Sequence, residues 1–455
     1  METESQKIPC FQSYDIRGKV PDELDEGLAY DVGRAYVEFV RPQGPVAVGR
    51  DVRLSSPAMS AAVIRGLNDA GVDTLDLGLC GTEMVYFASA QPGCGGGIMV
   101  TASHNPPEYN GMKLVRAQGR PISADTGLQD IEAMVLGGKF NSSSGRGANR
   151  RLDVTADFVD KVLSFVDPDS LSPLSLVANC GNGCAGPILD VIAERLPLRL
   201  VFVDREPDGA FPHGVPNPIL PERRDRTANA VREHGADLGV AWDGDFDRCF
   251  FFDENAGFVE GYYLVGLLAE RLLRGSPGGK IVHDPRLIWN TLDIVQAAGG
   301  TPVQCKSGHA FIKQVMRAED AVYGGEMSAH HYFRDFYYCD SGMAPWLIVA
   351  SILSETGRTM SELLGEREEM FPCSGEINEE VADQEATIAR VREHYEPQLT
   401  EIDETDGISM TFGDRWRMNL RASNTEPVLR LNVETRGSRE LLEEKTAEVL
   451  ALIKQ

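Results

Sequence analysis

The stretch GGIMVTASHNPPEYNGMK, residues 96–113, places a short apolar run directly before a serine, a histidine and several turn-forming residues. The run, which includes Ile98–Val100, predicts a buried strand, and the prolines and glycine after it predict that the strand ends in a loop. Ligands of α/β proteins bind beyond the carboxyl ends of the strands. We therefore expect Ser103 and His104 to face a ligand, with Lys113 shortly after them as a third candidate.

The same pattern of strand followed by helix recurs along the chain. VAVGRD (46–51) indicates a strand, and SSPAMSAAVIRGLNDAG (55–71) indicates a helix with serines at its start and a glycine at its end. The alternation restarts at LSLVANCGNGCAGPILDVIAERL (174–196) and again at KIVHDPRLIWNTLDIVQAAGG (280–300). Alternating strands and helices predict parallel α/β units, and a Gly-, Ser- and Arg-rich segment at 136–151 suggests a boundary after the first of them.

The last part of the chain has a different pattern. ISMTFGDRWRMNLRASNTEPVLRLNVETR (408–436) alternates as antiparallel strands do, and SRELLEEKTAEVLALIKQ (438–455) has the period of an amphipathic helix. This indicates a smaller α+β domain at the C-terminal end.

Composition excludes several classes of protein. The 455 residues carry a net charge of −25, which argues against general binding of nucleic acid or of anionic membranes. The start lacks the basic and apolar regions of a signal peptide, and the longest apolar run, Ala344–Leu353, is shorter than the roughly 20 residues of a membrane span. Nine cysteines scattered singly predict no disulfide framework. We expect a cytoplasmic protein of several domains.

Three aspartates in WDGDFDR, namely Asp243, Asp245 and Asp247, suggest a site for a hard cation such as Mg²⁺ or Ca²⁺. An EF-hand is excluded, because Arg248 stands where that loop needs glycine and strand-like runs flank the motif in place of helices. A solvated acidic turn remains the simple alternative. The arginine directly after the acids suggests that the site also meets an anion.

If Ser103 carried a phosphoryl group, its oxygen could complete the coordination of a metal held by the three aspartates. The metal would then neutralise charge while the phosphoryl group moves. A hydrolytic serine is the alternative, but the G-x-S-x-G motif is not present around Ser103. The transfer scheme also needs an acid or base for the accepting hydroxyl, for which His104 and Lys113 are the local candidates.

Two further loops carry groups suited to a sugar phosphate. RASNTEPVLR (421–430) gathers two arginines with hydroxyl and amide donors, the composition of a phosphate-binding loop, although an ordinary turn would also use these residues. GEMSAHH (325–331) offers Glu326 and Ser328, which could bind neighbouring sugar hydroxyls, or could be satisfied within a buried loop. The segment KSGHAF (306–311) and the arginines at positions 17, 50 and 53 are less informative alone.

Together, YDIRG, TASHNPPEYNGMK, DGDFDR, GEMSAH and RASNTEP, in this order along nearly the whole chain, resemble the α-D-phosphohexomutase family, most closely the bacterial phosphomannomutases. The resemblance implies three similar α/β domains with mixed sheets and a smaller C-terminal α+β domain around one central cleft. Their expected bounds are 1–150, with the phosphoserine loop, 151–255, with the metal loop, 256–368, with the sugar loop, and 369–455, with the phosphate loop.

The resemblance also implies roles for individual residues. The family's phosphoserine falls on Ser103, beside His104, and the proposed acid/base lysine falls on Lys113. Its Mg²⁺ ligands fall on the serine phosphate and the three aspartates. Sugar recognition falls on Glu326 and Ser328. The remaining implied substrate-binding residues are Arg17, Arg248, Arg286, His309, His330, Arg421, Ser423, Asn424 and Thr425.

The implied reaction interconverts mannose 6-phosphate and mannose 1-phosphate through phosphoserine and a hexose 1,6-bisphosphate, which also acts as activator. A phosphoglucomutase or a dual-specificity enzyme is the alternative, with glucosamine phosphate as a further substrate. A metal-dependent phosphatase, a glycosyltransferase and an inactive sugar-phosphate-binding protein are the other classes that the motifs leave open. The expected partners are small hexose phosphates, and the expected state is a monomer or a homodimer that feeds GDP-mannose synthesis.

Overall fold

The computed structural model describes residues 7–143, 145–423 and 428–455. The chain divides into two compact units. The first comprises residues 1–258 together with 332–357, and the second comprises residues 259–331 together with 358–455. Within the described residues, no helix combines the length and the apolar character needed to cross a membrane.

The first unit begins with a mixed sheet in the order β1-β5-β4-β2-β3-β7, with β6 beside β5. Strands β4, β2, β3 and β7 run parallel, and β5 is antiparallel to both β1 and β4. The strands are β1 (Ile16–Lys19), β2 (Val46–Arg50), β3 (Thr74–Leu79), β4 (Gly96–Val100), β5 (Tyr109–Arg116), β6 (Arg120–Pro121) and β7 (Asn149–Arg151).

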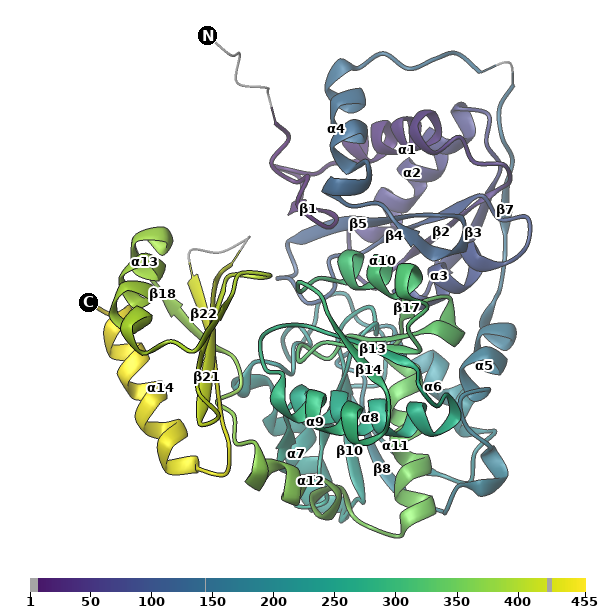
Figure 1. The fold of residues 1–455 in the computed structure, drawn as a ribbon. Coiled ribbons are helices and arrows are strands. Elements are labelled where there is room, and N and C mark those ends of the chain that lie inside the picture. The colour runs from purple at the N-terminus through teal and green to yellow at the C-terminus, as the bar shows by residue number, and fades with distance from the viewer. Residues whose placement is uncertain (1–6, 144, 424–427) are drawn as a thin grey trace. The chain divides into compact units, whose positions relative to one another are not determined.

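Helices cover both faces of this sheet. Figure 1 shows α1, α2 and α4 on one face and α3 on the other. The helices are α1 (Glu26–Val40), α2 (Ser56–Asp69), α3 (Thr82–Ala90) and α4 (Leu128–Gly137). Buried side chains of α1 and α2, such as Val32 and Leu67, pack with Val46 and Val48 of β2 into one apolar core. The strand at 46–50 and the helix at 56–69 confirm the alternation that the sequence predicts.

A second sheet in the same unit has the order β12-β11-β10-β8-β9, in which β10, β8 and β9 are parallel and β11 is antiparallel. Its strands are β8 (Ser175–Asn179), β9 (Arg199–Val203), β10 (Leu238–Trp242), β11 (Cys249–Phe252) and β12 (Phe258–Val259). Its helices are α5 (Thr155–Leu163), α6 (Ala185–Ala193) and α7 (Asp225–His234). The aspartate motif therefore joins two strands, as expected, and the structure agrees with the exclusion of an EF-hand.

A segment from later in the chain completes the first unit. It contains β16 (His331–Phe333), β17 (Cys339–Asp340) and α11 (Met343–Thr356), and β16 pairs with β17 antiparallel. The indole nitrogen of Trp242 donates to the carbonyl of Gly342 at 2.9 Å, and its ring meets the edge of Trp346. The longest apolar run of the sequence, Ala344–Leu353, is thus the buried part of α11.

The second unit contains a parallel group of strands in which β13 lies between β14 and β15. Its elements are α8 (Gly261–Gly275), β13 (Lys280–His283), α9 (Trp289–Ala297), β14 (Thr301–Gln304), α10 (His309–Glu319), β15 (Tyr323–Gly325) and α12 (Met360–Met370). The carboxyl ends of these parallel strands lie at the same edge, so the loops after β13 and β15 come together there.

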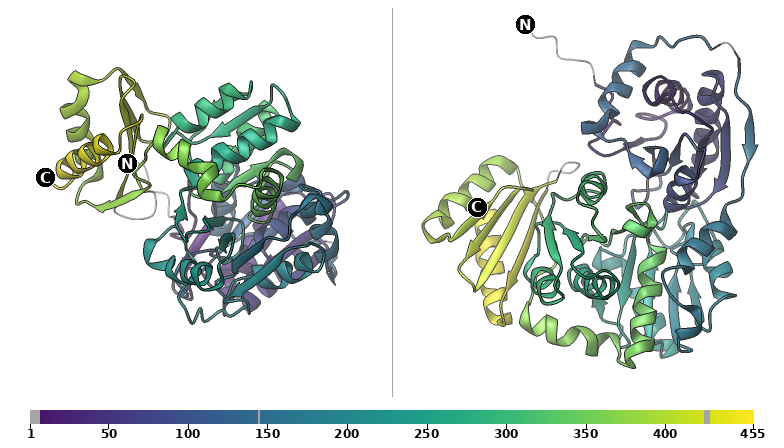
Figure 2. Two further views of the ribbon diagram at one scale, coloured as in Figure 1. Left: turned by 90° about the horizontal axis from the view of Figure 1, so that it is seen from below. Right: turned by 45° about the vertical axis from the view of Figure 1, so that its right-hand side comes forward.

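The C-terminal part of the second unit is an antiparallel sheet in the order β18-β22-β21-β20-β19. Figures 1 and 2 show α13 and α14 packed against one face of it. Its elements are β18 (Ile377–Glu380), α13 (Gln384–Tyr395), β19 (Glu401–Asp403), β20 (Ile408–Phe412), β21 (Trp416–Ala422), β22 (Val428–Thr435) and α14 (Arg439–Ile453). This confirms the predicted α+β architecture.

One buried carboxyl, that of Glu83, links α3 to the start of α11. It accepts hydrogen bonds from the amides of Gly342 and Met343, both at 3.1 Å, and from the Ser341 hydroxyl. Glu83 has 0% of its surface exposed. Burial raises the pKa of this carboxyl well above its ordinary value, although the three hydrogen bonds oppose the rise.

We expect Glu83→Gln to fold normally, because the amide oxygen can accept from the two backbone amides while its nitrogen donates to Ser341. Glu83→Ala should lower the free energy of unfolding by about 1–3 kcal/mol, since the amide of Gly342 is left without an acceptor. Because the folded state holds the proton of Glu83 more tightly than the unfolded chain does, the parent loses stability as pH rises above about 4.3. The advantage of Glu83→Gln over the parent should therefore grow from pH 4 to pH 7 in denaturant unfolding experiments. A glutamine variant as unstable as the alanine variant would contradict this account.

Candidate active site

Ser103 lies in the loop after β4, where the sequence predicts it, and only 3% of its surface is exposed. Its backbone adopts φ of +48°, the left-handed conformation. An L-residue there costs roughly 1–2 kcal/mol. Its amide donates to the Thr101 hydroxyl at 2.8 Å. The surrounding structure therefore holds the serine in an unfavourable backbone conformation.

The loop after β10 brings a carboxylate to this serine. The Ser103 hydroxyl donates to Asp243 Oδ2 at 2.6 Å, and Asp243 is fully buried. The close approach requires a glycine between the aspartates, because a Cβ at Gly244 would lie 2.7 Å from the carbonyl oxygen of Ser103. Two loops that are 140 residues apart in the sequence thus share one buried contact.

The carboxylates of the three aspartates converge, as the metal hypothesis requires; they belong to Asp243, Asp245 and Asp247. Each offers a carboxylate oxygen, and these oxygens lie within 4.8 Å of one another. All three side chains are buried. Oδ1 of Asp245 is buried and has no hydrogen-bond partner among the described residues. A buried acceptor without a donor is costly unless something binds it. Oxygen ligands of this number and charge fit Mg²⁺.

Lys113, on β5, lies against the same aspartates. Its ammonium group is 2.7 Å from Asp245 Oδ2 and 2.5 Å from Asp247 Oδ2. Burial opposes the charge on Lys113, but the two carboxylates outweigh it and raise its pKa above the usual value. Burial likewise opposes ionisation of Asp245, yet Lys113 and the hydrogen bonds hold the pKa of that carboxyl below its usual range. The ion pairs make a buried cluster of acids tolerable.

Thr82 is a residue of this cluster that the sequence analysis did not find. It begins α3, and its amide donates to the carbonyl of Asp245 at 3.0 Å, while its hydroxyl donates to Asp245 Oδ2 at 2.5 Å. The start of a helix carries partial positive charge and favours a carboxylate. Threonine is common at the start of helices in general, so the sequence gives no signal of this role.

Arg248 and His104 flank the serine on its other side. The Arg248 guanidinium donates to Asp243 Oδ2 through Nε at 3.0 Å and Nη2 at 2.9 Å, and also to His104 Nδ1. The same ring nitrogen is 3.0 Å from the Ser103 hydroxyl. Enclosure away from water, together with Arg248 and Arg17, holds the pKa of His104 well below its usual range. Arg17 reaches the serine loop by donating to Asn105 Oδ1 at 2.6 Å.

The second unit gathers the expected sugar-binding residues around Arg286. Its guanidinium makes a bidentate pair with Asp284, at 2.9 Å for each hydrogen bond, and is buried. Ser328 Oγ accepts from it at 3.3 Å, and Glu326 Oε1 lies 3.6 Å away. The backbone amide of Met327 donates to Asp284 Oδ2 at 3.0 Å. Asp284, two residues before Arg286, therefore fixes both the arginine and the loop after β15.

One carboxylate, that of Glu376, whose side chain is 9% exposed, draws three arginines together. Its oxygens lie 3.2 Å from Arg286, 3.3 Å from Arg421 and 3.8 Å from Arg430. Although burial opposes ionisation, the three guanidinium groups hold the pKa of Glu376 below its usual range. The sequence analysis missed this residue, because GEIN at 375–378 resembles no binding motif. Glu376 therefore gathers three guanidinium groups at one place in an acidic protein.

The remaining predicted residues are placed as follows. Ser423 accepts from Arg430 Nη2 at 3.4 Å. His309 begins α10, and its ring centre is 6.4 Å from that of His330. Asn424 and Thr425 lie outside the described residues. The serine–aspartate cluster belongs to the first unit and the arginine cluster to the second.

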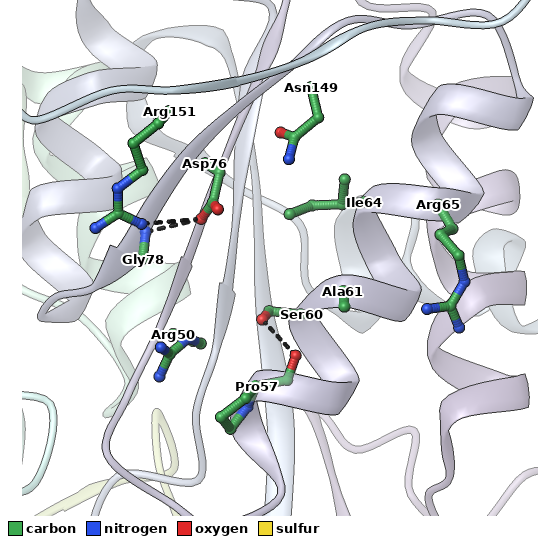
Figure 3. Close-up of a pocket in the computed structure, with 10 residues that line it drawn as sticks. All are labelled: Arg50, Pro57, Ser60, Ala61, Ile64, Arg65, Asp76, Gly78, Asn149 and Arg151. Carbon is green, nitrogen blue, oxygen red and sulfur yellow. Dashed lines mark hydrogen bonds and ion pairs between the residues drawn. The ribbon is translucent and has the colours of Figure 1, made fainter.

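A hollow of about 450 Å³ elsewhere in the first unit contains none of the predicted site residues. Figure 3 shows it between α2 and the strands β3 and β7, with the Arg151 guanidinium bonded to Asp76 on its wall. Its side chains do not take part in the contacts described above.

Comparison with known proteins agrees with this geometry. Four models of the phosphoglucomutase/phosphomannomutase family match the chain: α/β/α domain I at 9–142, domain II at 156–257, domain III at 260–371 and the C-terminal domain at 376–452.

Similar proteins cover nearly the whole chain. A protein of Xanthomonas campestris named "Phosphohexose mutases" is 58% identical over 98% of this chain and 99% of its own. A phosphomannomutase of Escherichia coli K12 is 54% identical over 99% of this chain and 100% of its own. The crystal structure of a phosphoglucomutase/phosphomannomutase family protein from Burkholderia thailandensis is 31% identical, with a TM-score of 0.87 over 98% of this chain and 97% of that one.

The domain order, the buried serine beside three aspartates and these likenesses have one explanation: the chain belongs to the phosphoglucomutase/phosphomannomutase family of phosphohexomutases.

Proposed function

We propose that this protein is a phosphomannomutase that interconverts mannose 6-phosphate and mannose 1-phosphate. The observation that carries the proposal is the buried contact between Ser103 Oγ and Asp243 Oδ2, at 2.6 Å, within a cluster of three aspartates. A serine so placed can carry a phosphoryl group whose charge a metal on the aspartates would balance. The name of the Escherichia coli relative supports mannose phosphate as the substrate.

In the proposed reaction, phospho-Ser103 gives its phosphoryl group to the free hydroxyl of mannose 1-phosphate or mannose 6-phosphate. The bond between phosphorus and Ser103 Oγ breaks, a bond to the sugar oxygen forms, and the hydroxyl proton passes to a base. Mannose 1,6-bisphosphate then turns over; the bond between its other phosphorus and the sugar oxygen breaks as Ser103 Oγ bonds to that phosphorus, and the Ser103 hydroxyl proton passes to the sugar oxygen. His104 and Lys113 are the proposed proton carriers, and a hexose 1,6-bisphosphate is the proposed activator that restores phospho-Ser103.

Asp243, Asp245, Asp247 and the serine phosphate would hold Mg²⁺, which supplies electrostatic stabilisation of the transferring phosphoryl group. The chain's own groups act around that site. Arg248 orients Asp243, and Arg17 holds the serine loop through Asn105. Arg286, Arg421 and Ser423 would bind the phosphate that is not being transferred, and Glu326 and Ser328 would bind the sugar hydroxyls, together with His309 and His330.

A serine hydrolase fits the contacts less well. The base of a catalytic triad is oriented by a carboxylate, whereas His104 Nδ1 faces the Arg248 guanidinium. We therefore propose transfer to a sugar rather than to water. We further propose a cytoplasmic enzyme, monomeric or homodimeric, and its nine free cysteines support a reducing compartment.

A second candidate function is a dual phosphomannomutase and phosphoglucomutase. The relative with 58% identity has the broader name "Phosphohexose mutases", which favours considering both sugars. Mannose and glucose phosphates differ only at C2, so a loop that reads the neighbouring hydroxyls could accept both.

Phosphorus-31 NMR tests the proposed reaction directly. The protein is incubated with Mg²⁺, a trace of glucose 1,6-bisphosphate and either mannose 1-phosphate or glucose 1-phosphate. Growth of a 6-phosphate signal without free phosphate is the expected result, with the faster rate for mannose. Equal rates would favour the dual enzyme, release of free phosphate would indicate a phosphatase, and an unchanged spectrum would contradict the proposal.

Ser103→Ala should abolish mutase turnover, because the substitution removes the oxygen that is proposed to carry the phosphoryl group. Binding of mannose 1-phosphate, measured by calorimetry, should stay within about threefold of the parent, since the proposed phosphate and sugar loops are unchanged. Mutase activity above about 1% of the parent would exclude Ser103 as the carrier.

Asp245→Asn should weaken binding of Mn²⁺, used as a probe for the Mg²⁺ site, by at least about tenfold in calorimetric titration. The substitution removes one anionic ligand and leaves Lys113 with less compensation. Asp225→Asn, an exposed residue at the start of α7, is the matched control and should bind Mn²⁺ as the parent does. Equal affinity in the two variants would argue against the aspartate site.

Arg421→Met should raise the KM for mannose 1-phosphate by about 10- to 100-fold, the effect of losing a charge-assisted hydrogen bond of about 1.5–3 kcal/mol to phosphate. The flexible apolar side chain preserves much of the volume of the arginine stem. An unchanged KM measured in the mutase assay would remove Arg421 from the phosphate site.

A further inference from the structure

Arg53 lies in the loop between β2 and α2, and its side chain holds the loop that carries Ser103 by donating to backbone carbonyls of that loop. The side chain has 0% of its surface exposed. Its two terminal nitrogens donate to four carbonyl oxygens at 2.6–2.9 Å: Nη2 to Ser103 and Asn105, and Nη1 to Pro106 and Tyr109. One guanidinium thus gathers four carbonyls from a seven-residue stretch that contains the proposed phosphoserine.

Asp51 holds the other side of the same serine. Its Oδ2 accepts from the Thr101 hydroxyl at 2.8 Å and lies 3.3 Å from Arg53 Nε. Its Oδ1 accepts from the Ser56 hydroxyl at 2.5 Å and from the amide of Arg53 at 3.1 Å. Because the Thr101 hydroxyl donates to Asp51, its lone pair is oriented to accept the amide of Ser103.

The amide and the carbonyl of Ser103 are therefore both fixed from outside the loop. Asp51 fixes the amide through Thr101, and Arg53 fixes the carbonyl directly. Two held peptide groups determine the φ and ψ between them. They account for the left-handed φ of +48° at a residue that is not glycine.

The arrangement depends on the shape of the guanidinium as well as on its charge. Arginine presents donors in a rigid planar fork, whereas a lysine ammonium is a compact charge on a flexible chain. The Phe211 ring, itself 4% exposed, lies 5.5 Å from the Arg53 guanidinium carbon and helps to enclose it. A lysine at this position could not reach carbonyls on both sides of the fork at once.

We propose that Arg53 and Asp51 are positioning residues for phosphoryl transfer, which hold the backbone of Ser103 so that its Oγ faces the aspartates. The inference rests on the proposed function, since it assigns these residues to the transfer through Ser103. Neither side chain contacts that hydroxyl. Both act through the peptide groups on either side of it.

The test compares three variants with the parent. Arg53→Lys keeps the charge and removes the fork, and Thr101→Val keeps the branched shape and removes the hydroxyl between Asp51 and Ser103. Leu67→Ala is the matched control, because Leu67 belongs to the apolar core of α2 and makes none of these polar contacts. The readouts are kcat and KM for mannose 1-phosphate, and the rate at which labelled glucose 1,6-bisphosphate phosphorylates Ser103.

Arg53→Lys and Thr101→Val should each lower kcat by at least about 100-fold, the effect expected for a small misplacement of a reacting atom. KM should stay within about threefold of the parent, and phosphorylation of Ser103 should slow in parallel. Leu67→Ala should lower the melting temperature while its kcat stays near that of the parent. A kcat within threefold of the parent in both Arg53→Lys and Thr101→Val, or a rise in KM alone, would overturn the inference.

Hydrogen exchange of the peptide 101–112 gives a readout that does not depend on the reaction. Exchange should be faster in Arg53→Lys and Thr101→Val and unchanged in Leu67→Ala. Unchanged exchange in both Arg53→Lys and Thr101→Val overturns the inference. If Arg53→Lys does not fold, the kcat, KM and exchange of Thr101→Val decide by the same criteria. A parent without mutase activity would instead refute the proposed function, with the exchange result still deciding whether Arg53 and Asp51 hold the loop.

Discussion

Three buried carboxylates lie beside one buried serine, and the structure around them is organised to make that concentration of negative charge stable. Lys113 pairs with both Asp245 and Asp247, and Arg248 pairs with Asp243, so the two cations offset two of the three negative charges. Taking such groups out of water costs several kcal/mol for each ion unless each charge is paired and hydrogen-bonded. Thr82 at the start of α3 donates two further hydrogen bonds to Asp245, and the missing side chain at Gly244 lets the aspartate loop approach Ser103.

The same principle, with the charges reversed, organises the second unit. The buried Asp284 pairs there with Arg286, and Glu376 lies beside Arg286, Arg421 and Arg430. In a chain of net charge −25, a site for anionic sugar phosphates requires such local gathering of arginines. The first unit thus offers a cluster of carboxylates suited to a cation, and the second a cluster of arginines suited to phosphate.

Local patterns in the sequence were sufficient to predict the strands that carry both sites. The apolar runs before Ser103 and Asp243 correspond to β4 and β10, and the three aspartates converge as the metal hypothesis expected. Contacts between distant segments could not be predicted in this way. Arg53 contacts carbonyls 50 to 56 residues away. Because every residue has a backbone carbonyl, the residue types give no indication of which carbonyls an arginine will bind. The role of Glu376 could likewise not be predicted, because its arginine partners are distant in the sequence and only the fold brings them to it.

The central claim is that Ser103 carries the phosphoryl group between the two positions of the sugar. The most direct measurement is to phosphorylate the protein with radiolabelled glucose 1,6-bisphosphate, remove the excess, add unlabelled mannose 1-phosphate and follow the label through a single turnover. The account predicts that the label leaves phospho-Ser103 and appears in hexose bisphosphate and then in mannose 6-phosphate. Label that stays on the protein during turnover, or that is released only as inorganic phosphate, would contradict it.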